Sequence, residues 1–123
     1  MAARRPPRPR LDLTAPEVWN VTWQMFRCLR EQMQMVVACR ESLAQPGHHL
    51  AWLYTPKHLV EREQEVAATR LSILKLMEYG RQTGLFHQPP ADMLAEMLDR
   101  ANKRDAEDAQ KEAARRPATG IGL

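Results

Sequence analysis

A three-part helix-start signal near the amino-terminal end constrains the fold of this chain more than any other feature. Thr14 and Glu17 have the spacing of a capping box, in which each side chain satisfies the free backbone amide of the other residue. Pro16 falls in the first turn, where no amide partner is needed. Leu13 and Val18 occupy the two hydrophobic-staple positions that flank such a cap. The signal predicts a long helix that runs until the next Pro-Gly pair.

Two further helices are predicted by the same kind of punctuation. The second begins at Thr55, which is followed by a proline, and it ends before Gly84, a glycine that suits a C-cap. The third begins near Pro89 and is amphipathic. Glycine is scarce and no run of residues alternates between apolar and polar, so a sheet is not expected. We therefore predict an all-α, three-helix bundle over residues 14–101, with helices at about 14–44, 55–83 and 89–101.

Other segments flank or interrupt this bundle. Residues 1–13 form a basic arm rich in proline and arginine, expected to be extended or disordered. The connector 45–54 carries several large apolar residues and is expected to fold back over the core. Residues 102–116 are polar on all sides, which predicts a helical extension that either frays in solvent or orders against a partner. Residues 117–123 are expected to form a flexible tail.

The first helix is apolar on about twice the arc that a surface helix normally buries. On a helical wheel, one apolar stripe holds two tryptophans and a phenylalanine, and a second holds Val18, Leu29 and Val36. Val21, Cys28, Met35 and Cys39 continue the arc. The sequence alone leaves open which stripe is core and which is interface. Because the companion helices are short of apolar residues, we expect part of the arc to bind another helix. The candidate interface residues are Trp19, Trp23, Phe26, Met33 and Val37.

The two cysteines lie 11 residues apart on one expected helix, so their Cα atoms are about 16 Å apart along the axis, too far for a disulfide. Cys28 and Cys39 are therefore expected to be inert packing residues in a reducing, intracellular compartment. No secretory signal or membrane span is expected from the sequence.

No catalytic, cofactor or metal site is predicted. The histidines are His48, His49, His58 and His87, and none has the paired spacing of zinc ligands. Catalytic triads and phosphate-cradling glycine loops are absent from the sequence.

Charge is concentrated in the arm. Arg4, Arg5, Arg8 and Arg10 give residues 1–10 four positive charges and no acid, whereas residues 11–123 have 14 basic and 15 acidic residues. We therefore expect a non-enzymatic interaction or assembly subunit, which self-associates or binds a protein partner through the first helix. The alternative is a small nucleic-acid-associated accessory protein, of the kind found in phages and plasmids, whose four arginines contact phosphates.

Overall fold

The fold was analysed in a computed structural model, which describes residues 12–45, 47 and 54–116. Three helices make up this part: α1 (Ala15–Ala44), α2 (Pro56–Gln82) and α3 (Pro90–Arg115). No strand occurs in the described ranges. The all-α, three-helix prediction is confirmed. The basic arm, the connector and the tail lie wholly or mostly outside the described residues.

The helix ends are set by local hydrogen bonds. The Thr14 hydroxyl accepts from the Glu17 amide and the Glu17 carboxylate accepts from the Thr14 amide at 3.0 Å, which confirms the capping box of α1. α2 starts with a second capping box, in which His58 takes the place of the usual acid. At the other end of α2, Gly84 has a φ of +82° and the Leu85 amide donates to the Gly80 carbonyl at 2.8 Å. That bond joins two residues five positions apart across the end of the helix. Together with the positive φ of Gly84 it defines a glycine C-cap.

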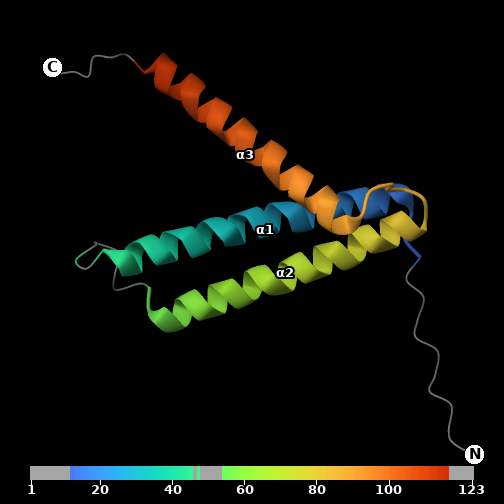
Figure 1. The fold of residues 1–123 in the computed structure, drawn as a ribbon, viewed down its shortest axis with the longest axis horizontal. Helices are drawn as coiled ribbons and strands as arrows, with labels where there is room; N and C mark the ends of the chain where they lie inside the picture. Colours follow the sequence, from blue (N-terminus) through green and yellow to red (C-terminus); the bar gives the residue numbers. More distant parts are fainter. Residues whose placement is uncertain (1–11, 46, 48–53, 117–123) are drawn as a thin grey trace, which may run out of the picture.

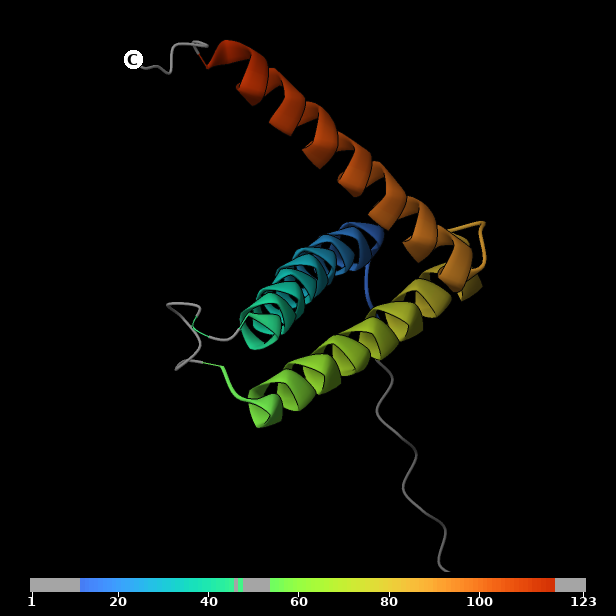
Figure 2. The ribbon, with the colours of Figure 1, turned by 60° about the vertical axis from the view of Figure 1, so that its left-hand side comes forward.

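α1 and α2 lie side by side and run antiparallel, as both ribbon views show (Figures 1 and 2). The Leu13 amide donates to the Tyr79 hydroxyl at 2.9 Å and ties the start of α1 to the end of α2. On α1, residues spaced alternately three and four positions apart form a series in which every side chain is buried or half-buried. α2 has a matching series. The series are Val18, Thr22, Met25, Leu29, Gln32, Val36, Cys39 and Leu43 on α1, and Leu59, Arg62, Val66, Thr69, Ile73, Leu76 and Gly80 on α2. This is the spacing of a two-helix coiled-coil seam.

The main core lies at the end of this helix pair where α3 begins. Val18, Phe26 and Leu29 of α1 meet Ile73 and Met77 of α2 there. The core is completed by Phe86 of the turn and by Met93 and Leu94 in the first turns of α3. The other end of the pair has fewer buried apolar residues, Val36 and Cys39 among them.

α3 packs on the pair through its first three turns and then leaves it at an angle (Figures 1 and 2). No Cα atom of α3 comes within 8 Å of a Cα atom of α1. The predicted amphipathic helix and its polar extension form one continuous helix to Arg115, and all side chains from Asn102 to Arg116 are exposed. The direction of α3 therefore opens a wedge between α3 and α1.

No helix in the described part of the chain is both long enough and apolar enough to cross a membrane.

Candidate interaction surface

The five residues predicted as an interface lie on the side of α1 that α3 crosses, but they differ in exposure. Trp23 is 48% exposed, Val37 51% and Trp19 39%. Met33 is half-buried against the core, whereas Phe26 is 3% exposed and belongs to the core itself. The surface open to a partner is therefore Trp19, Trp23, Met33 and Val37, which we call the Trp stripe.

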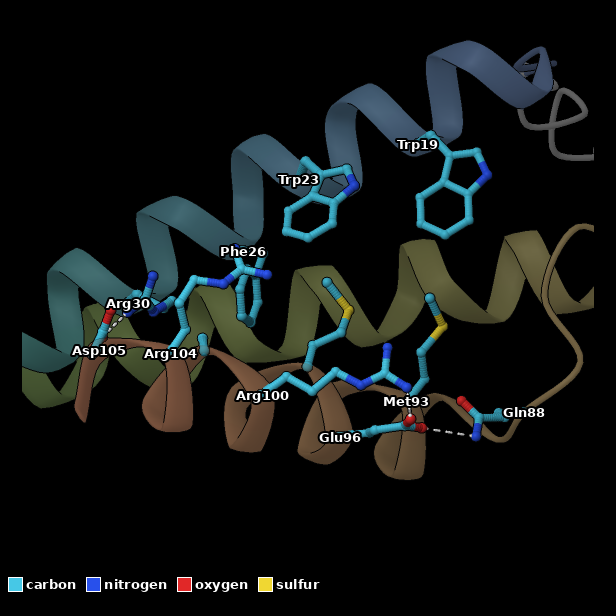
Figure 3. A pocket seen from close by; sticks show the side chains of 12 residues that line it. Trp19, Trp23, Phe26, Arg30, Gln88, Met93, Glu96, Arg100, Arg104 and Asp105 are labelled. Atoms are coloured by element: carbon cyan, nitrogen blue, oxygen red, sulfur yellow. Dashed lines mark hydrogen bonds and ion pairs between the residues drawn. The ribbon is translucent and has the colours of Figure 1, made fainter. Parts of the chain in front are cut away.

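A cleft of about 590 Å³ lies between α1 and α3 (Figure 3). Trp19, Trp23 and Phe26 line it from α1, and Met93 and Met97 line it from α3. The cleft therefore joins an aromatic wall to a wall of two flexible methionines, a combination suited to apolar side chains.

Both indole rings are held by edge-to-face contacts with buried phenylalanines. The Trp19 ring centroid lies 4.9 Å from that of Phe86, at an interplanar angle of 83°. The Trp23 centroid lies 5.8 Å from that of Phe26, at 84°. Aromatic pairs favour this geometry. Each tryptophan is therefore oriented by the core while a large part of its surface stays in contact with solvent.

The charged side chains of the cleft are mostly paired. Arg30 of α1 forms an ion pair with Asp105 of α3, and Arg100 pairs with Glu96 on α3. The Gln88 side-chain amide donates to the Glu96 carboxylate at 3.0 Å. Arg104 also lines the cleft and forms no ion pair within residues 12–45, 47 and 54–116. The Arg30–Asp105 pair closes one end of the cleft.

Two smaller hollows continue the Trp stripe beyond that ion pair. One, of about 410 Å³, is lined by Met33 and Val37 of α1 and Leu98 of α3. The next, of about 350 Å³, lies between α1 and α2 and is lined by Met33, Val37 and Val66. All five predicted residues thus line a hollow, and the Trp stripe follows a nearly continuous apolar path along α1.

The cysteines do not share one environment, contrary to the sequence-based expectation. Cys39 is buried, but Cys28 is exposed. Exposed Val21 and Met35 lie seven residues to either side of Cys28. The seam of the helix pair passes through Cys39 and leaves Cys28 beside it, so the prediction that Cys28 is a packing residue was wrong.

Titratable groups with shifted pKa values sit at helix ends and not in the cleft. The Thr14 hydroxyl and amide donate to Glu17 and lower the pKa of its carboxyl below 4.5. Hydrogen bonds from Arg81 lower the pKa of Glu78 in the same direction. Both groups are exposed parts of helix caps or last turns, so these shifts mark local stability and not acid–base chemistry.

Within the described ranges, no group of three or more His, Cys, Asp or Glu side chains is placed to hold a metal ion. His58 caps α2 and His87 is exposed in the turn before α3. His48, His49 and the arginines Arg4, Arg5, Arg8 and Arg10 lie outside the described residues.

No family model, curated protein sequence or solved structure matches the chain.

Proposed function

We propose that this chain is a non-enzymatic helical assembly subunit that binds a protein partner, or further copies of itself, through the Trp stripe. The observation that carries the proposal is the pair of tryptophans, each oriented by a buried phenylalanine and still more than a third exposed. Tryptophan is one of the residue types enriched at the energetic hot spots of protein interfaces. Pre-oriented rings lose little side-chain entropy on binding, which favours association.

The hollows on the Trp stripe fit a partner helix. Trp19 and Val37 are 18 residues apart, so the stripe is about 27 Å long, or about five helical turns. A helix lying in such a groove contacts it through side chains spaced three and four residues apart. Arg104 lies at the edge of the cleft. A carboxylate on the partner helix is favoured there, because it would form an ion pair with the Arg104 guanidinium.

The proposal is tested by native mass spectrometry and sedimentation of the purified protein. We expect assemblies heavier than the 14.2 kDa of one chain, or a stable complex with a partner. Trp23→Glu and Val37→Glu should each weaken the assembly at least tenfold while the circular dichroism spectrum stays helical, because both side chains are about half exposed.

A matched control is Leu71→Glu on α2, where the replaced side chain is 55% exposed and lines none of the three hollows of the Trp stripe. It should leave the assembly intact. A wild-type protein that stays monomeric at high concentration and yields no partner, with Trp23→Glu variants that unfold, would assign the stripe to the core and end the proposal.

A further inference from the structure

A second apolar strip lies on the side of α1 opposite the Trp stripe. Val21 is 38% exposed and Met35 is 40% exposed, with exposed Cys28 midway between them. Cys28 is nine residues from Trp19, which turns it by about 180° on the helix. The strip therefore presents a surface that no part of the Trp stripe shares.

Along seven turns this side of α1 is uncharged apart from Glu31, which lies at its edge three residues from Cys28. From Val18 to Leu43, the residues that point this way are Val21, Gln24, Met25, Cys28, Gln32, Met35, Cys39 and Ser42. On the adjoining side of α2, exposed Ala68 and Ser72 are small, and Glu65, one turn before Ala68, is paired with Arg62 of the same helix. The Ser72 hydroxyl already donates to the Ala68 carbonyl at 3.0 Å. The Ser42 hydroxyl on this side is already buried with no hydrogen-bond partner among the described residues, so covering the strip from Val21 to Met35 would bury no further unbonded hydroxyl.

The strip is complementary to itself when a second α1 lies antiparallel to the first. With a two-fold axis at Cys28, Val21 of one copy faces Met35 of the other, and Cys28 faces Cys28, because both spacings are seven residues. Such a two-fold contact needs no other surface on either copy.

The charges beside the strip match under the same symmetry. Arg27 and Glu31 lie along one edge of it and are both exposed. Neither forms an ion pair with another residue of the part that the structure describes. In the antiparallel arrangement, the edge of the strip that carries Arg27 and Glu31 lies beside the same edge of the second copy. Arg27 of each copy therefore lies within one helical turn of Glu31 of the other. Two ion pairs then fix the register.

We propose that a second copy of this chain docks antiparallel on the strip formed by Val21, Cys28 and Met35, with the two-fold axis at Cys28. The contact goes beyond the proposed function, because it uses the other side of α1 and leaves the Trp stripe free for a partner.

Thiol cross-linking tests the position of the axis. A short bis-maleimide, which adds to two thiols without oxidation, should give a covalent dimer of twice the 14.2 kDa chain mass. Peptide mapping should place the link between Cys28 and Cys28, and Cys28→Ser should abolish it. A link through Cys39, or no dimer at concentrations where the wild type is fully alkylated, would overturn the proposal.

Charge reversal tests the register. Arg27→Glu and Glu31→Arg should each raise the dimer Kd about tenfold or more, because each places like charges across both contacts. Mixing the two variants should restore the dimer as a mixed species, since every facing pair is then opposite in sign. Each chain in that mixture still carries like charges at positions 27 and 31 of its own helix, so a recovery reports contact between copies. If the mixture dissociates like the single variants, the antiparallel register is wrong.

Substitutions on the two sides of α1 separate this contact from the Trp stripe. Met35→Glu should dissociate the dimer, whereas Trp23→Glu should leave the Cys28 cross-link unchanged and abolish only partner binding or higher assembly. Leu71→Glu on α2 is the matched control, since that side chain is 55% exposed and lies outside the strip. If Trp23→Glu removes the dimer and Met35→Glu does not, the antiparallel dimer is refuted and the proposed function stands.

Discussion

Gly80 shows how one residue positions the aromatic cluster of the cleft. The Phe86 ring lies directly over it, so that a Cβ atom at position 80 would stand 2.3 Å from Phe86 Cδ2. The same ring holds Trp19 edge-on. A lone glycine inside a helical pattern signals such a close approach, and the sequence alone did not tell us which side chain makes it.

Gly80→Ala should therefore destabilise the protein by about 1–3 kcal/mol, as overpacking does, although alanine is the better helix former. Urea unfolding followed by tryptophan fluorescence measures both effects, since a displaced Phe86 ring also changes the surroundings of Trp19. Gly84→Ala is the comparison: its φ is +82° with nothing within 4 Å, so it should lose stability with native fluorescence unchanged. Equal stability of Gly80→Ala and wild type would contradict the close approach.

Glu17 gives the amino-terminal cap a defined pH dependence. Its carboxyl pKa is lowered in the folded chain because the hydroxyl and amide of Thr14 donate to it. A group with a lowered folded pKa adds stability above its unfolded pKa and loses that contribution as the pH falls through the folded value. Glu17→Gln should thus be less stable than wild type at pH 7, and the difference should shrink below the ordinary pKa of 4.5. Denaturant unfolding of both proteins at pH 7 and at a pH below 4.5 measures this. A difference in unfolding free energy that does not change with pH would contradict it.

Among the elements, the ends of the helices were predictable from the sequence. Which residues of α1 face α2 was predictable only in part. The capping box at Thr14 and the glycine cap at Gly84 are local signals, and the structure has both. The wheel, drawn at 3.6 residues per turn, placed Trp19, Trp23, Met33 and Val37 on one side together with Phe26, which the structure puts in the core. The seam instead repeats every 3.5 residues and drifts by about 20° per heptad relative to a straight helix. Cys28 and Cys39 lie at nearly the same wheel angle, and yet Cys39 is part of the seam and Cys28 lies beside it.

The charged half of α3 is linked by ion pairs within the helix and does not pack on the core. Lys103 pairs with Asp99 in the preceding turn, at 3.0 Å. From Asn102 to Arg116 every side chain is exposed. The charged half of this helix thus contributes helical content and little packing.

Ending the chain after Asp105 should therefore lower the helical signal while changing the unfolding free energy by no more than about 1 kcal/mol, the range of exposed ion pairs. Thermal and urea unfolding check this. Met93→Ala, in the buried first turn of α3, is the contrasting variant and should cost about 2–5 kcal/mol. A truncated chain that melts as low as Met93→Ala would show that the charged half supports the core.

At the scale of the whole molecule, the charge of the arm stands apart from the helical body. Deleting residues 1–10 should leave helical content and the melting temperature nearly unchanged, because the capping box begins at Thr14. If the arm binds nucleic acid, its four arginines neutralise at most four phosphates, and the log–log salt slope is no steeper than about −3.6. Filter binding across a salt series measures the slope. Binding that survives the deletion would place a phosphate site on the body and favour the nucleic-acid alternative.

The attachment of α3 has a mechanical consequence. With 26 residues, this helix is about 39 Å long, yet past its first three turns it is joined to α1 by the exposed Arg30–Asp105 ion pair. Exposed pairs of this kind contribute at most about 1 kcal/mol. A rotation of about 10° at the turn before Pro90 would carry the far end of α3 about 7 Å, the width of most of a helix. A small change in the cleft beside the tryptophans would therefore produce a much larger displacement at the far end of α3 than at its first turns.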